Sequence, residues 1–256
     1  MLPYIYYPEI HIWKLTIMTW GLIAAIGFLV ATFIAIREAK QKNANPDHVY
    51  NMLFILLIAG IIGSRIFHII LHWGDYSHNL WKIFAIWEGG LAFFGGFALA
   101  ISCAIIYTRI KGLNIWEYSD IIAPSFVIGH AIGRIGCYIA DGGHIGKATT
   151  MPWGVLYHGE IVHSTSIYSA LFLFCLFGVL MYIRKKEIYT KTRGLLFLTY
   201  AIIYAIGRFM IDLLRIDQIY FGLTATQYGL IAAFILSIIF IAIKVKNGRK
   251  NKIPHN

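Results

Sequence analysis

The stretch IGHAIGRIGCYIADGGHIGKATTMPWGV, residues 128–155, begins as an apolar helix and continues into a loop rich in Gly and Thr. Arg134 stands in the apolar part, well before the stretch turns polar at Asp141. A charge at that depth in a bilayer is costly, by about 3 kcal/mol even on insertion-based scales. The stretch therefore predicts a membrane-spanning helix that carries a cation in need of an anionic partner.

The composition of the whole chain agrees with a membrane protein. Of its 256 residues, 59% are hydrophobic and only 13% are charged, which fits a polytopic membrane protein and no soluble class. Hydropathy predicts an all-α fold of seven membrane-spanning helices, each near the roughly 20 residues that cross a bilayer. These spans are placed at residues 16–36, 49–71, 91–107, 116–140, 166–183, 194–215 and 225–243.

The basic residues predict how these helices are oriented. Loops on one side of the membrane hold fifteen Lys and Arg, whereas the opposite side holds only Lys14, Lys82 and Lys147. The positive-inside rule then puts the N-terminus outside and the C-terminus in the cytoplasm. Because topology accounts for the net charge of +10, no nucleic-acid partner is expected.

The chain reads as one integral-membrane domain over residues 1–256. Its longest segments outside the spans lie near residues 72–90 and 141–165, both on the extracytoplasmic side, and function is expected on such loops. Cys103, Cys137 and Cys175 show no CxxC spacing, and no His, Asp or Glu spacing resembles a metal triad. Neither a metal nor a cofactor is therefore expected.

Three outward-running spans each carry an arginine near the outer end: Arg65, Arg134 and Arg208. At about 1.5 Å per residue these side chains lie roughly 10 Å below the outer surface, at the depth of outer-leaflet phosphates. A guanidinium binds phosphate in a bidentate manner, so three at one depth favour an anion site. The alternative is that each arginine ties helices together through carbonyls and carboxylates.

The sixth span adds a stripe of polar residues at helical spacing, formed by Tyr204, Arg208, Asp212 and Arg215. Asp212 is expected to pair with Arg208, with Arg215, or with both. Arg134 has His130 one turn before it, and the first carboxylate that follows it is Asp141, two turns away. The phosphate of a bound lipid is therefore its expected counter-ion.

The opening stretch resembles the signature segment of the bacterial prolipoprotein diacylglyceryl transferases. Further segments follow in the order of that family, over most of residues 16–230: GIIGSRIFHII, IWEGGLAFFGG, VHSTSIYSALF and YAIGRFMIDLLR. Enzymes of this family move the diacylglyceryl group of phosphatidylglycerol onto the thiol of a lipobox cysteine, forming a thioether and releasing glycerol 1-phosphate. The resemblance implies an enzyme of the bacterial inner membrane that faces the extracytoplasmic leaflet. Its partners would be phosphatidylglycerol and lipobox prolipoproteins, and we expect a monomer.

The resemblance also implies roles for particular residues. Arg134 and Arg208 would hold the lipid phosphate, with Asp212 orienting Arg208 and Tyr204 nearby. The expected substrate site also includes the arginine of the second span and two glycines of the opening stretch: Arg65, Gly133 and Gly146.

The chain departs from the family pattern at the position of a candidate base. Phe94 stands where family members commonly carry His and sometimes Tyr. The base that deprotonates the substrate thiol is then expected among polar residues near the outer ends of the spans: Asp141, His144 and His163. This departure also permits a non-catalytic relative that binds lipid or precursor. The arginines alone would suit a transporter of an anionic solute, although the broken helices and repeats typical of transporters are not seen.

Overall fold

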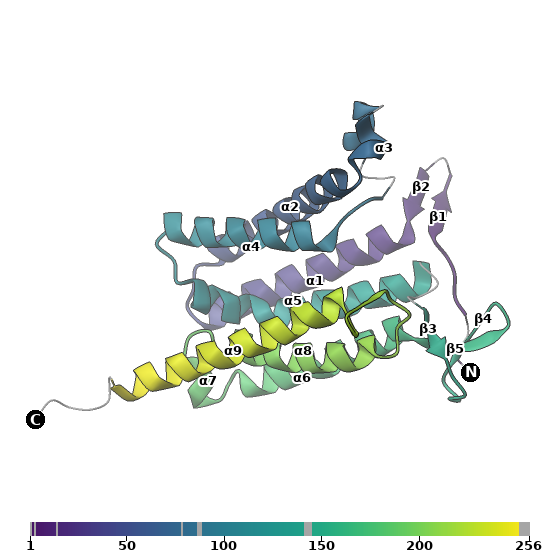
Figure 1. The fold of residues 1–256 in the computed structure, drawn as a ribbon. Helices are drawn as coiled ribbons and strands as arrows, with labels where there is room; N and C mark the ends of the chain where they lie inside the picture. Colours follow the sequence, from purple (N-terminus) through teal and green to yellow (C-terminus); the bar gives the residue numbers. More distant parts are fainter. Residues whose placement is uncertain are drawn as a thin grey trace, which may run out of the picture. The chain divides into compact units, whose positions relative to one another are not determined.

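The structure is a computed structural model that describes residues 2, 4–13, 15–77, 79–85, 89–140 and 145–250. It is mostly helical (Figure 1). Within these residues, six helices are long and apolar enough to cross a membrane, and α4 is a shorter apolar helix, so the chain is a polytopic membrane protein. The long helices are α1 (Thr19–Gln41), α2 (Pro46–Leu71), α4 (Phe93–Ile110), α5 (Ile115–Ala140), α6 (Thr165–Ile183), α8 (Leu195–Asp212) and α9 (Ala225–Lys250).

The described chain divides into two compact units, which are treated separately. One unit contains residues 1–35 and 119–256, and the other contains residues 36–118. The first unit holds most of α1 and α5 together with α6, α8 and α9, and it carries Arg134, Arg208 and Asp212. The second unit holds α2 and α4 and carries Arg65.

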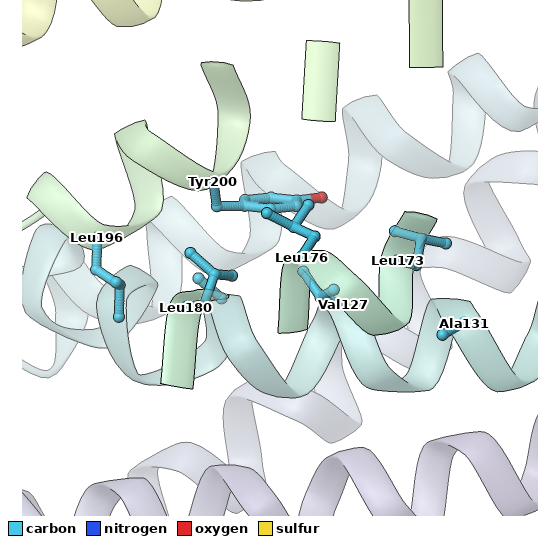
Figure 2. Close-up of a cluster of buried hydrophobic side chains, with 8 residues drawn as sticks. Val127, Ala131, Leu173, Leu176, Leu180, Leu196 and Tyr200 are labelled. Carbon is cyan, nitrogen blue, oxygen red and sulfur yellow. The ribbon is translucent and has the colours of Figure 1, made fainter. Parts of the chain in front are cut away.

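The core of the first unit lies where α5, α6 and α8 meet (Figure 2). Small and branched residues of α5, among them Val127 and Ala131, pack against Leu173 and Leu176 of α6 and Tyr200 of α8. Half of the apolar window of α5 is buried, against 17% for α9. The helix α5, which is the more buried, is therefore the central helix of this unit. The helix α9 is apolar and little buried, which suits a peripheral helix that faces lipid.

The start of α8 is held by a carboxylate that is distant in sequence. Gly194 precedes the helix in the left-handed conformation, with φ of 83°. The backbone N–H of Gly194 donates to Oδ2 of Asp120 at 2.5 Å, and that of Phe197 donates to Oδ1 at 2.8 Å. Asp120 belongs to α5 and is buried, so it ties α5 to the otherwise unpaired first turn of α8.

The second unit is built on α2 and α4, which pack side by side. A Cβ on Gly63 of α2 would lie 2.5 Å from the carbonyl oxygen of Gly95 on α4, so both glycines permit close helix approach. Asn45 caps α2 by accepting from the backbone N–H of Asp47 at 2.9 Å. The short helices α3 (Trp73–Ser77) and η1 (Leu80–Ile83) follow α2, and α7 (Glu187–Lys191) lies in the first unit.

The first unit also contains three small antiparallel sheets, so the prediction of an all-α fold holds only for the spans. Two of their turns, His158–Gly159 and Phe221–Gly222, have positive φ at both positions and close tight two-residue hairpins. The strands form the sheets β1–β2, β3–β5–β4 and β6–β7. Their bounds are β1 (Glu9–Ile12), β2 (Leu15–Met18), β3 (Ile145–Ala148), β4 (Val155–Tyr157), β5 (Glu160–Ser164), β6 (Ile219–Tyr220) and β7 (Leu223–Thr224).

Candidate functional site

A buried ion pair stands at the C-terminal end of α8. Arg208 and Asp212 are four residues apart and therefore share a helix face. Nη2 of Arg208 lies 2.8 Å from Oδ1 of Asp212, and the two residues are 6% and 3% exposed. The two groups form an ion pair, but their geometry does not meet the criteria of a hydrogen bond. Nη1 of Arg208 donates to Oγ of Ser169 on α6 at 3.4 Å, which joins the pair to a second helix.

Arg215, just beyond α8, finds its main partner outside the predicted stripe. Its Nε lies 2.9 Å from Oδ2 of Asp217 and its Nη2 donates to Oδ1 of the same carboxylate at 3.1 Å. The distance from Nε to Oδ1 of Asp212 is 3.9 Å. Asp212 therefore pairs chiefly with Arg208, and Asp217 is a carboxylate that the sequence reasoning missed.

Arg134 lies on α5 and is half-buried. Its Nε donates to Nε2 of His130, one turn earlier, at 3.2 Å. Its charge interacts with Arg208 and with Asp212. Among the residues that the structure describes, however, no carboxylate lies within ion-pair distance of Arg134. Arg134 was predicted to lack an acidic partner in its own helix, and none of the other described elements supplies one.

Tyr204 lies close enough to both arginines to interact with their charges. Its ring is 5.8 Å from that of His130 on α5 and 5.7 Å from that of Tyr200 on α8. Arg134 and Arg208 both interact electrostatically with its hydroxyl. The packing of α5 and α8 therefore brings together four residues that were expected to form one site: Arg134, Tyr204, Arg208 and Asp212.

The sheet β3–β5–β4 joins this cluster through the residues that directly follow α8. The backbone N–H of Lys147 donates to the carbonyl of Leu214 at 2.8 Å, and Gly146 forms an isolated antiparallel β-bridge with Arg215. A Cβ on Gly146 would lie 2.6 Å from that same Leu214 oxygen and 2.9 Å from Cβ of His163 on β5. Gly146 therefore has a packing reason to be glycine, in addition to any role at the substrate.

Gly133 differs from Gly146 in this respect. It lies beside Arg134 on α5, and a Cβ placed there would meet nothing within 4 Å. Packing within the described chain therefore gives no reason for a glycine. Open space beside Arg134 is what a bound substrate would need.

His163 is the expected base whose position the structure describes. It lies on β5, half-buried, and its Nδ1 is 3.0 Å from the hydroxyl of Tyr168 on α6. Its strand pairs with β3, which in turn contacts the end of α8. Asp141 and His144, the other expected bases, lie outside the described residues.

Arg65 belongs to the second unit, where backbone carbonyls surround it. Nε donates to Ile83 at 3.0 Å, and Nη1 donates to Gly89 and Gly90 at 2.6 and 3.2 Å. Nη2 donates to Lys82 and to Ala85. Since a guanidinium has five N–H donors, all of them are used in binding carbonyls of η1 and of residues that follow it. In this conformation Arg65 presents no free donor to a phosphate.

Comparisons with known proteins identify the family of the chain. A model of the family described as prolipoprotein diacylglyceryl transferase matches residues 9–245. The chain is 37% identical over 206 residues to a phosphatidylglycerol–prolipoprotein diacylglyceryl transferase of Clostridioides difficile, which covers 80% of this chain and 82% of that protein. It is 34% identical over 253 residues to the protein of the same name from Oceanobacillus iheyensis, with coverage of 93% and 87%. For the one from Clostridium botulinum strain Loch Maree, identity is 33% over 252 residues, with coverage of 94% and 97%.

Proposed function

The chain belongs to the prolipoprotein diacylglyceryl transferase family, so it transfers the diacylglyceryl group of phosphatidylglycerol to prolipoproteins, and we propose that this reaction takes place at the outer ends of α5 and α8. The acceptor is the thiol of the lipobox cysteine, the bond formed is a thioether, and glycerol 1-phosphate leaves. We assign the lipid phosphate to Arg134 and Arg208, with Asp212 orienting Arg208 and Tyr204 beside both.

The charge balance of the site carries this proposal. Three guanidiniums stand against two carboxylates among the described residues of the cluster, which leaves one positive charge in excess. Arg208 has Asp212 and Arg215 has Asp217, so the excess charge belongs to Arg134. The phosphodiester of phosphatidylglycerol bears one negative charge and matches it. An unpaired cation within a membrane span is otherwise costly, so a lipid phosphate is the natural counter-ion.

The same cations favour the transition state. When the thiolate sulfur attacks the glyceryl carbon next to the phosphate, the carbon–oxygen bond breaks and its electron pair goes to the phosphate oxygen. The phosphate thereby passes from one negative charge to nearly two, because it becomes a monoester. Donors fixed in place before reaction stabilise such growing charge more than they stabilise the bound lipid. Arg208 is fixed in this way by Asp212 and Ser169.

The thiol must lose its proton to become the nucleophile. His163, whose ring nitrogen contacts Tyr168, is our candidate among the described residues, and Asp141 and His144 are the other candidates. The two glycines of the expected substrate site would act through the space that they leave. Gly133 would leave room for the lipid beside Arg134, and Gly146 would set β3 against the end of α8.

The proposed orientation follows from the charges of the loops. We place the N-terminus outside, the C-terminus in the cytoplasm and the site toward the outer leaflet of the bacterial inner membrane. Its support is the excess of Lys and Arg on one side of the spans. Counting α4 as a span gives seven, and both units then act as one monomeric transferase domain over residues 1–256. Arg65 would serve the substrate indirectly, by fixing η1 and the residues Gly89 and Gly90 that follow it.

Complementation tests the transfer reaction. A bacterial strain depleted of its own transferase is supplied with this chain, and the mass of a reporter lipoprotein is measured. We expect the reporter to gain a diacylglyceryl group, and we expect no gain with Arg134→Gln expressed at the same level. A chain that reaches the membrane and binds phosphatidylglycerol without modifying the reporter would be a non-catalytic relative, and the proposal would be wrong.

A further inference from the structure

His130 has no role in the transfer reaction as derived above, yet it makes the one hydrogen bond that the described chain offers to Arg134. The geometry points to His130 as the residue that orients Arg134: the imidazole takes the Nε–H of the guanidinium and leaves both terminal nitrogens for the lipid phosphate. This inference rests on the proposed function, because it assumes that Arg134 binds that phosphate.

The direction of the hydrogen bond defines the state of the imidazole. Nε of Arg134 lies 3.2 Å from Nε2 of His130, and a guanidinium nitrogen can only donate. Nε2 must therefore accept, so the ring is neutral and carries its proton on Nδ1. Nδ1 is buried and has no hydrogen-bond partner among the described residues. No second hydrogen bond to a described residue therefore holds the ring, and Arg134 is its polar partner.

The surroundings of the ring hold it in the position that Arg134 needs. His130 packs between Phe126, one turn earlier on α5, and Tyr204 on α8, with ring centroids 6.1 and 5.8 Å away. A four-residue spacing on a helix places the imidazole directly below the arginine. Without an acceptor at Nε, the long side chain of Arg134 has several rotamers available and its planar fork has no fixed direction.

The bond matters because a guanidinium offers two usable edges. Bidentate binding of a phosphate through Nη1 and Nη2 requires the third nitrogen, Nε, to be turned away from the lipid. An acceptor at Nε selects that orientation before the substrate arrives. A preorganised donor pair is worth more in the transition state than one that must reorient, so the loss should appear in the rate as well as in binding.

The deciding comparison is between two amides. His130→Gln places its amide oxygen near the position of Nε2 and can still accept from Arg134. His130→Asn places its amide near Nδ1 and cannot reach. Both variants lose the ring and both are polar, but Asn is one methylene smaller, so His130→Leu is added to separate a packing role from the loss of the acceptor. The release of glycerol phosphate from phosphatidylglycerol in the presence of a lipobox peptide is measured with purified protein in detergent.

We expect His130→Gln to stay within a few-fold of the wild-type rate and His130→Asn to fall by about 10- to 100-fold, the usual effect of losing one hydrogen bond to a charged group. His130→Leu, which keeps apolar bulk, should fall as far as His130→Asn while its thermal stability is kept. The matched control is His48→Leu, which removes a part-buried histidine of α2 that contacts the hydroxyl of Tyr107, and it should remain near wild type.

Equal rates for the Gln and Asn variants, whether high or low, would overturn the positioning role. Arg134→Lys, measured in the same series, separates this result from failure of the proposed function. If Arg134→Lys is strongly impaired while His130→Asn is as active as wild type, only the role of His130 is wrong. If Arg134→Lys keeps the wild-type rate, the assignment of the phosphate to Arg134 is wrong.

Discussion

Asp212 and Asp217 are carboxylates five residues apart whose surroundings differ sharply. The side chain of Asp212 is fully buried against Arg208, whereas that of Asp217 is 30% exposed against Arg215. Removing one member of a buried pair leaves an uncompensated charge and costs about 3–5 kcal/mol, but an exposed pair contributes about 0–1 kcal/mol. We therefore expect Asp212→Asn to lower the melting temperature and the transfer rate strongly, and Asp217→Asn to change both slightly. Both quantities are measured, by thermal unfolding and by glycerol phosphate release. Similar losses in the two variants would contradict the assignment of Asp212 to Arg208.

Gly146 and Gly133 form a second matched pair at the scale of residues. Gly146→Ala would push a methyl group to 2.6 Å from the Leu214 carbonyl, whereas Gly133→Ala would meet open space. The first change should destabilise the contact between β3 and α8. The second should hold or raise stability, by up to about 1 kcal/mol, because alanine is the better helix former. Thermal unfolding of both variants checks this, and an equal loss at Gly133 would show that its surroundings are filled.

The helix α8 carries most of the site, and its start depends on Asp120. Asp120→Ala removes the acceptor for two N–H groups of the first turn, which should lower the free energy of unfolding by about 1–3 kcal/mol. Asn45→Ala is the control, because that cap of α2 is exposed and accepts from a single N–H. Its loss should be about 1 kcal/mol. The transfer rate per folded molecule should be unchanged in both variants. A specific loss of rate in Asp120→Ala with unaltered stability would mean that Asp120 acts on the site and not on the helix.

The elements show which parts of the structure hydropathy could predict. The apolar runs located the long helices, and most bounds agree to within three residues, as for α8 at Leu195–Asp212 against the predicted 194–215. The helices α1 and α9 end later than predicted, at Gln41 and Lys250. Hairpin turns were missed, although His158–Gly159 carries the X–Gly signal that such turns require. The Asp120 cap was beyond reach, because its donors lie more than seventy residues away in sequence.

The candidate site divides in the same way. The spacing of Arg208 and Asp212 predicts their pairing, because both lie on one helix face. The carbonyls around Arg65 were not predictable, since an irregular segment supplies them and backbone polar groups leave no trace in residue type. Depth in the membrane is therefore a guide to where an arginine lies, and local geometry decides what it binds.

At the scale of the whole molecule, the proposed orientation is open to chemical labelling. In a variant whose three native cysteines are replaced by alanine, a cysteine is introduced either at His158, in the turn between β4 and β5, or at Lys185, between α6 and α7. Both positions are exposed. A membrane-impermeant maleimide added to intact cells should label His158→Cys and not Lys185→Cys, and permeabilised cells should label both. The reverse pattern in intact cells would invert the proposed topology and place the site in the wrong leaflet.

The central claim is that the guanidinium of Arg134 binds the phosphate of the lipid that reacts. The most direct measurement is glycerol phosphate release by purified wild type, Arg134→Lys and Arg134→Gln, each with phosphatidylglycerol and with or without a lipobox peptide. Wild type should release it only when the peptide is present. Arg134→Lys keeps the charge but loses the planar fork and should fall by about 100-fold or more, and Arg134→Gln should be inactive. Arg134→Lys should still fold, and Arg134→Gln should keep or gain thermal stability in lipid-free detergent, because it removes a cation that has no carboxylate partner in the described chain. Near wild-type release by both variants would contradict the claim and place the phosphate elsewhere.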